Sequence, residues 1–151
     1  MYRMAVAAAL LALSGCVTVT VTDDTVEVGA VDCARPAKVA SPGTISVQPV
    51  ASHPIADAPG KTLTSILLVV PPGAKSMAHK HAGVVFGYVL EGAVCSQITG
   101  DDGLRLYKAG DDFFEPPGSH HLAFTNPGAS DAKVLVTQIA DAGSQLTTVL
   151  P

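Results

Sequence analysis

Short β-type runs separated by glycine and proline turns constrain this chain more than any other feature of its sequence. From residue 61 onward, runs rich in valine, threonine and isoleucine end after a few residues at turn-forming residues. The chain contains 14 glycines and 11 prolines, which interrupt helices, whereas β-branched side chains suit a pleated strand. No segment has an apolar repeat of helical period long enough to compete. The sequence therefore predicts an all-β sandwich or barrel.

The runs of the C-terminal part predict eight strands. They cover residues 62–70, 84–90, 93–99, 104–107, 112–115, 121–125, 133–139 and 145–149. Prolines and glycines recur through residues 32–60, so this part is expected to be irregular apart from a short strand near 44–50. Apolar and polar residues alternate over residues 17–31, which is typical of a hairpin or an extended tether.

The first fifteen residues have the form of a secretory signal peptide. Arg3 precedes an apolar run from Ala5 to Leu13, which is too short to span a bilayer as a stable helix. The run ends in Leu-Ser-Gly-Cys, which resembles the lipobox of bacterial lipoproteins and makes Cys16 the expected lipidation site. A plain secretory signal is the alternative. We expect export to the bacterial cell envelope on the periplasmic side, with a signal peptide over 1–15, an extension or tether over 16–58 and a barrel domain over 59–151.

Export also affects how Cys33 and Cys95 are interpreted, because disulfides persist outside the reducing cytosol. A bond between them would close a loop of about sixty residues and restrict the unfolded chain. The alternative is two buried free thiols, which is the state we favour from the sequence.

Four of the five histidines fall into two pairs, His79 with His81 and His120 with His121. Side chains two residues apart on a strand project from the same face, so His79 and His81 can bind one metal ion. Neighbouring residues on a strand point to opposite faces, so only one of His120 and His121 can reach that ion.

The residues around both pairs resemble the two sequence motifs of the cupin family. The first motif, G(x)₅HxH(x)₃,₄E(x)₆G, is matched by Gly73, His79, His81 and Gly92, with Val85 in place of the glutamate. The second motif, G(x)₅PxG(x)₂H(x)₃N, is matched by Gly110, Pro116, Gly118 and His121, with Asn126 one residue late. The resemblance implies a double-stranded β-helix, the jelly-roll or cupin barrel, with a metal pocket in its mouth and an irregular N-terminal extension before it.

The resemblance makes His79, His81 and His121 the metal ligands. A valine cannot coordinate a metal, so a carboxylate from elsewhere is needed to compensate the charge of the ion. Glu115, which comes just before the bend that leads to His121, is the best substitute, either as a fourth ligand or as a group beside the ligands. His120 is expected to lie at the rim of the barrel. The alternative is a functional role, either as a proton carrier or as an alternative ligand.

Three histidine ligands leave coordination positions open for water or substrate, as in catalytic sites. Imidazole ligands suit one divalent transition metal, which can be Fe, Mn, Ni, Cu or Zn. The first hypothesis is a metal-dependent enzyme that acts on a small molecule, for example a dioxygenase-like enzyme, an isomerase or a hydrolase. The second is a non-catalytic module that binds or senses a metal or a small molecule. The third is a barrel whose histidines only fill its interior.

Charge limits the partners of the chain. Nine lysines and arginines against thirteen aspartates and glutamates give a net charge of −4, whereas a phosphate backbone requires a basic surface. We therefore expect no nucleic acid, but a small-molecule ligand or substrate and, through the lipid on Cys16, a membrane. The resemblance to cupins also implies a homodimer.

Overall fold

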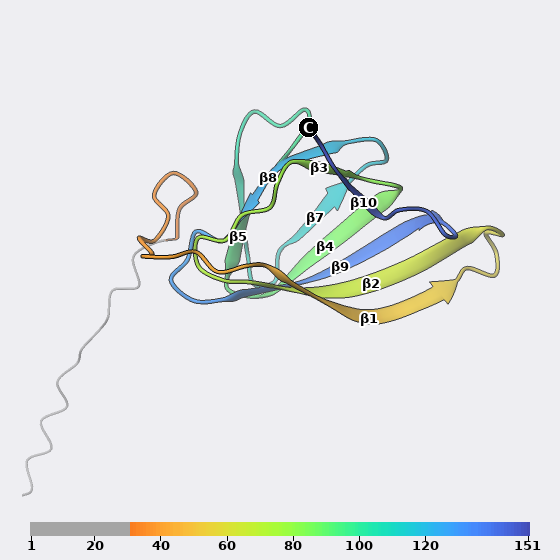
Figure 1. Ribbon diagram of the computed structural model, residues 1–151, viewed down its shortest axis with the longest axis horizontal. Helices are drawn as coiled ribbons and strands as arrows, with labels where there is room; N and C mark the ends of the chain where they lie inside the picture. Colours follow the sequence, from red (N-terminus) through yellow and green to blue (C-terminus); the bar gives the residue numbers. More distant parts are fainter. Residues whose placement is uncertain (1–30) are drawn as a thin grey trace, which may run out of the picture.

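Residues 31–151, which the computed structural model describes, form two five-stranded sheets that face each other (Figure 1). One sheet has the strand order β1-β2-β9-β4-β7 and the other has the order β10-β3-β8-β5-β6. The strands are β1 Ser46–Pro54, β2 Lys61–Val70, β3 His79–His81, β4 Val84–Glu91, β5 Ala93–Ile98, β6 Arg105–Lys108, β7 Asp112–Glu115, β8 His120–Thr125, β9 Ala132–Asp141 and β10 Thr147–Val149. All pairings between them are antiparallel. The predicted all-β jelly-roll barrel is confirmed.

The expected signal peptide over 1–15 and the lipidation site Cys16 lie outside the described residues. Of the expected extension over 16–58, the structure describes the part from residue 31 onward. Over these described residues, no helix is both long and apolar enough to cross a membrane.

Strand β1 is longer than the sequence predicts. It pairs with β2 from Ser46 to Pro54, with an irregularity after Pro49. The prolines argue against a strand here, because proline cannot donate to a central ladder, but β1 is an edge strand, where proline is tolerated. The first sheet thus begins at Ser46, where the sequence predicts the short strand near 44–50, and β1 precedes the barrel domain that was expected over 59–151.

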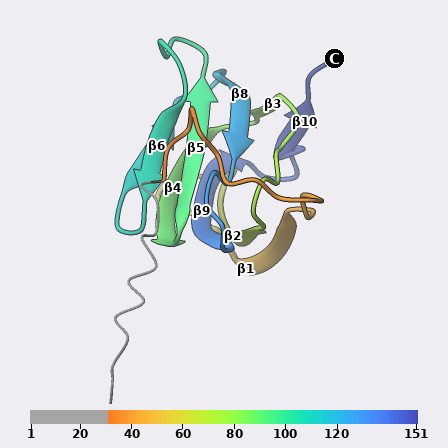
Figure 2. The ribbon, with the colours of Figure 1, turned by 90° about the vertical axis from the view of Figure 1, so that its left-hand side faces the viewer.

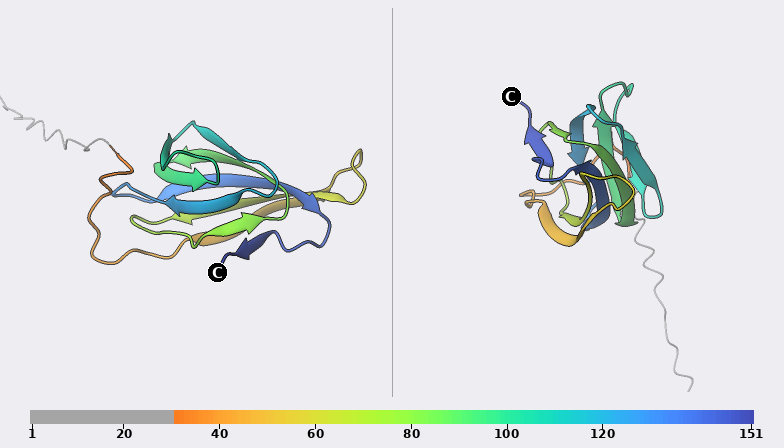
Figure 3. Two further views of the ribbon diagram at one scale, coloured as in Figure 1. Left: turned by 90° about the horizontal axis from the view of Figure 1, so that it is seen from above. Right: turned by 90° about the vertical axis from the view of Figure 1, so that its right-hand side faces the viewer.

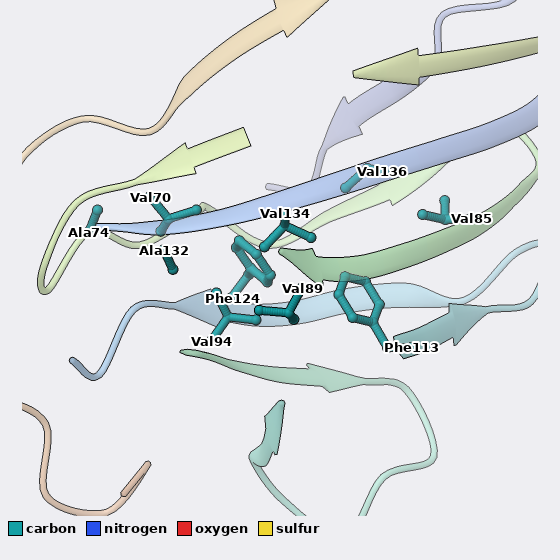
Figure 4. Packing of buried hydrophobic residues seen from close by; sticks show 10 residues of the cluster. All are labelled: Val70, Ala74, Val85, Val89, Val94, Phe113, Phe124, Ala132, Val134 and Val136. Atoms are coloured by element: carbon teal, nitrogen blue, oxygen red, sulfur yellow. The ribbon is translucent and has the colours of Figure 1, made fainter. Parts of the chain in front are cut away.

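Apolar side chains from both sheets pack together in the interior of the barrel (Figure 4). The buried cluster consists of Val70, Ala74, Val85, Val89, Val94, Phe113, Phe124, Ala132, Val134 and Val136. Phe113 lies directly against Gly87, where a Cβ atom would overlap the ring. The close approach of the ring to β4 therefore requires glycine at position 87.

Cys33 and Cys95 form a disulfide, with their Cα atoms 5.8 Å apart. The expectation of two free thiols, which we favoured from the sequence, is therefore wrong. Cys33 comes from the segment before β1 and Cys95 is fully buried on β5, so the bond attaches the N-terminal segment to the second sheet. The sequence alone could not show that this segment returns to β5.

A cavity of about 500 Å³ lies between the two sheets. Its lining includes residues of β1, β2 and β9 from the first sheet and of β3, β8 and β10 from the second. The edge strands β1 and β10 lie toward one side of the barrel and β6 toward the other (Figure 2). The C-terminal strand β10 is paired only with β3, at the edge of its sheet (Figure 3). The first and the last strands of the described chain thus contribute to the same cavity.

Candidate metal centre

Three histidines from two adjacent strands meet in the wall of this cavity. His79 and His81 lie on β3, and His121 on β8 is the cross-strand partner of His79. The ring of His79 lies 4.8 Å from the ring of His81 and 4.9 Å from the ring of His121, between centroids. One nitrogen from each ring can be chosen so that all three lie within 4.8 Å of one another. The structure therefore brings together the three histidines that the motifs single out.

Backbone carbonyl groups hold two of these rings in one orientation. His79 Nδ1 donates to the oxygen of Met77 at 2.7 Å, and His81 Nδ1 donates to the oxygen of Leu146 at 3.2 Å. Burial lowers the pKa of both imidazoles below the ordinary value, although the carbonyl contacts and Glu115 act in the opposite direction. Both rings are therefore neutral near neutral pH, and with the proton on Nδ1 each has a free electron pair on Nε2, the form that binds a metal.

The carboxylate of Glu115 lies between His81 and His121. Its Oε1 is 3.1 Å from His121 Nδ1, and its Oε2 is 3.8 Å from His81 Nε2. Glu115 is 3% exposed, and its Oε2 has no hydrogen-bond partner. The buried Oε2 of Glu115 and the Nε2 of His81 thus face each other with no hydrogen bond between them. Such a pair fits a bound cation.

The register of the first sheet explains why Glu115 can replace the missing motif glutamate. Val85 on β4 is 1% exposed and lines the cavity, and Glu115 on β7 is its cross-strand partner. Paired residues on neighbouring strands have side chains on the same face, with Cβ atoms about 5 Å apart. The carboxylate therefore comes from β7 instead of β4, and its side chain lies on the same inner face of the sheet.

The bend before β8 places His121 on the inner face. Gly118 has φ +80°, a left-handed conformation that glycine adopts without the steric cost of a side chain. His121 is 4% exposed, whereas its neighbour His120 is exposed and does not line the cavity. The structure therefore does not bring His120 to the other histidines.

Ser96 is a further residue of the centre that the sequence analysis missed. Its Oγ lies 2.8 Å from His121 Nε2, and both side chains are buried. Because this hydroxyl contacts Nε2, the other ring nitrogen of His121, Nδ1, is the one that faces Glu115. The sequence did contain a signal, because Ser96 has the same inward parity as Val94 on β5.

Ser96→Ala is expected to weaken metal binding by about 10- to 100-fold, because hydrogen bonds that orient a ligating histidine contribute that much to affinity. Competition with a chromophoric chelator measures this loss. Ser96→Thr keeps the hydroxyl and should retain most of the affinity. The matched control is Ser65→Ala, which removes a side-chain hydrogen bond to Thr137 away from the cavity. Equal affinities of Ser96→Ala and the control would show that Ser96 does not position His121.

The donor set is three imidazoles and one carboxylate. This set fits Fe, Mn, Ni, Cu or Zn, and four protein ligands leave room for a further ligand when coordination is five- or six-fold. Apolar side chains, among them Ile66, Leu68 and Val136, line the cavity together with the donors. The arrangement is suited to binding a small molecule next to an ion.

Comparison with known proteins agrees with this fold. The chain is 27% identical to TT1209 from Thermus thermophilus, with a TM-score of 0.52 over 73% of this chain and 94% of that chain. It is 25% identical to a mutant of oxalate decarboxylase OxdC from Bacillus subtilis, with a TM-score of 0.51 over 58% of this chain and 24% of that chain. It is 22% identical to the DMSP lyase DddQ from Ruegeria pomeroyi, with a TM-score of 0.52 over 58% of this chain and 42% of that chain. At this identity, the comparison shows similarity of fold alone.

The aligned part of the chain spans less than half of the DMSP lyase and about a quarter of the oxalate decarboxylase. No curated protein sequence matches the chain. Residues 66–138 match the family model of the cupin domain, and this range includes all three histidines and Glu115. With two facing antiparallel sheets around a three-histidine cluster, residues 66–138 are thus similar to the cupin domain in sequence and in fold.

Proposed function

We propose that this chain is a metal-dependent cupin enzyme of the bacterial cell envelope that acts on a small molecule, with His79, His81, His121 and Glu115 as the metal-binding residues. The observation that carries the proposal is the buried Oε2 of Glu115, which lacks a partner and faces the Nε2 of neutral His81. A bound Fe, Mn, Ni, Cu or Zn ion would supply Lewis-acid or redox chemistry there. A dioxygenase-like reaction is the activity we test first.

The other residues of the cavity have supporting roles in this proposal. The carbonyl groups of Met77 and Leu146 keep His79 and His81 in the tautomer that binds a metal. Ile66 and Leu68 line the cavity and exclude water from the substrate. The carboxylate of Glu115 offsets part of the charge of the ion, which imidazole ligands alone cannot do.

Elemental analysis of the mature protein, purified without a histidine tag, tests metal binding directly. The expected result is about one divalent transition metal ion per chain. Protein that remains free of metal after incubation with each of the five ions would contradict the proposal, and the histidines would then be barrel filling. For the enzymatic part, the Fe(II)-loaded protein is incubated with thiols, flavonoids and diketones under O₂, and oxygen uptake is expected with one of these classes.

A non-catalytic binding module is the second candidate. Apart from the three histidines and Glu115, Lys75 is the only titratable residue that lines the cavity of the described chain. If Glu115 binds the metal, the cavity holds no carboxylate or imidazole for general acid or base catalysis. Stoichiometric metal without turnover of any substrate class would favour this module.

The location in the cell envelope is a separate part of the proposal. The Cys33–Cys95 disulfide supports it, since disulfides are rare in the reducing cytosol. Cells that express the chain with radiolabelled palmitate should yield labelled protein, and Cys16→Ala should remove the label. Unlabelled wild-type protein would contradict the lipid anchor.

We also propose a homodimer. The outer face of the first sheet carries large exposed apolar side chains, among them Phe86 and its cross-strand partner Phe114. Tyr88 and Leu90 continue this face along β4. Contiguous apolar patches of this kind mark interaction surfaces. Sedimentation at low protein concentration should show a dimer, and Phe114→Asp should convert it to a monomer.

Val85→Glu is expected to tighten metal binding by about tenfold, because a second carboxylate beside Glu115 attracts the ion. The same change should destabilise the metal-free protein, since two buried like charges repel each other. Competition with a chelator and thermal unfolding measure the two effects. In the double variant Val85→Glu/Glu115→Val, the metal affinity lost through Glu115→Val should return. Unchanged affinity in all three variants would show that positions 85 and 115 do not face the ion.

A further inference from the structure

Three buried side-chain oxygens lack a hydrogen-bond partner within the described residues, and all three line the same cavity. They are Ser76 Oγ, Gln138 Oε1 and Glu115 Oε2. Buried polar atoms normally have partners, so a group of unsatisfied atoms around one cavity needs an explanation. The metal proposed above accounts for Glu115. Ser76 and Gln138 are left, and both suggest polar groups on a bound molecule.

Lys75 supplies the only positive side chain of the cavity lining in residues 31–151. Its ammonium group makes no ion pair or hydrogen bond within these residues, and its backbone is fixed by a β-bridge to Thr125. Ser76 follows it directly, with its hydroxyl buried and unsatisfied. Lys75 is an exposed residue of the lining, and its ammonium group and the hydroxyl of Ser76 offer two donors for the two oxygens of a carboxylate.

Most of the remaining wall is apolar. The side chains of Ile45, Ile66, Leu68 and Val136 line the cavity, with the rings of Phe113 and Phe124 at the core. The volume of about 500 Å³ corresponds to roughly seventeen water-sized groups at about 30 Å³ each. A sugar, which carries hydroxyl groups on all sides, would place several of them against this apolar wall without partners.

From these observations we propose that the cavity binds a small organic acid with an apolar body. Lys75 and Ser76 hold the carboxylate, the apolar body lies among the branched side chains, and Gln138 accepts a hydrogen bond from a second polar group of the molecule. Gln138 is the cross-strand partner of Val85, so this second group lies in the row of residues that contains Glu115. This inference rests on the proposed function in one respect only, since it names the substrate class of the same metal site.

Titration calorimetry of the mature protein, both metal-free and loaded with zinc, tests the inference with three probes of equal length: hexanoate, hexan-1-ol and hexylammonium. Hexanoate should bind at least tenfold more tightly than hexan-1-ol, since charge-assisted hydrogen bonds are stronger than neutral ones. Hexylammonium should show no binding. Acetate should bind about a hundredfold more weakly than hexanoate, because it lacks four buried methylene groups.

Lys75→Gln should weaken hexanoate binding by about tenfold and leave hexan-1-ol binding unchanged. The matched control is Lys80→Gln, which removes the same charge from an exposed residue that does not line the cavity. Equal binding of hexanoate and hexan-1-ol, or equal loss in the two lysine variants, would overturn the inference. Lys75-dependent hexanoate binding to a protein that takes up no metal would refute the proposed function and support the acid site. Metal uptake without this preference would do the reverse.

Discussion

The double variant His79→Ala/His81→Ala is expected to lose its metal completely in elemental analysis. Structural zinc sites with four ligands bind with about 10–16 kcal/mol, or roughly 3–4 kcal/mol for each ligand. Loss of two ligands should therefore weaken binding by at least about four orders of magnitude. His121 and Glu115 remain in this variant, but two donors cannot compete with water and buffer for the ion. Inductively coupled plasma mass spectrometry of both proteins after the same dialysis measures the difference.

Two histidines outside the centre provide controls. His53 lies exposed on the edge strand β1, and His120 is exposed next to His121. His53→Ala and His120→Ala should retain one ion per chain. If the double variant keeps as much metal as these controls while remaining folded, the ion is bound elsewhere. A thermal unfolding curve shows whether each variant is folded.

Cys33→Ala is expected to lower the free energy of unfolding by about 4 kcal/mol. The disulfide closes a loop between residues 62 positions apart, and the entropy model gives this value for a loop of that size. For a domain of this length, such a change is a large part of the total stability. Urea denaturation followed by circular dichroism measures it, and the slope with denaturant should rise because the unfolded chain becomes more extended.

Reduction of the wild-type protein serves as the control for this prediction. Dithiothreitol should lower the stability of the wild type to that of Cys33→Ala and should leave the variant unchanged. Wild type and variant with the same stability under oxidising conditions would contradict a stabilising disulfide. Metal content should be compared at the same time, because Cys95 is adjacent to Ser96, which contacts His121.

Most strands of the barrel could be predicted because their residues satisfy local rules. In β9 the inward residues Val134 and Val136 alternate with outward residues, and the strand lies between clear turn residues. Strand β1 was predicted too short, since Pro49 and Pro54 are acceptable only on an edge, and edge position depends on the whole topology. The return of Cys33 to β5 likewise depends on contacts between distant segments.

The candidate centre could be predicted in part. The spacing of His79, His81 and His121 predicted that they lie together, and the structure agrees. Glu115 was singled out by its place before the bend, whereas the physical reason is its register opposite Val85.

The contributions of Ser96, Ser76 and Gln138 require knowledge of which strands are neighbours and which polar atoms remain unsatisfied. A local pattern cannot provide this. The local signal of Ser96 and of Gln138 was only that each is a polar residue at an inward position of its strand.

The attachment of Cys33 to β5 has a mechanical consequence for a chain held at its N-terminus. Tension that enters through the residues before Cys33 passes across the disulfide into β5, which is hydrogen-bonded on both sides by β6 and β8. The segment that follows Cys33 carries Ile45 and Val47 into the cavity wall, and it lies beyond that point of attachment. A force on the N-terminal segment is therefore carried by β5 and not by the residues of the cavity wall. In the reduced protein, the same force would begin to separate β1 from β2.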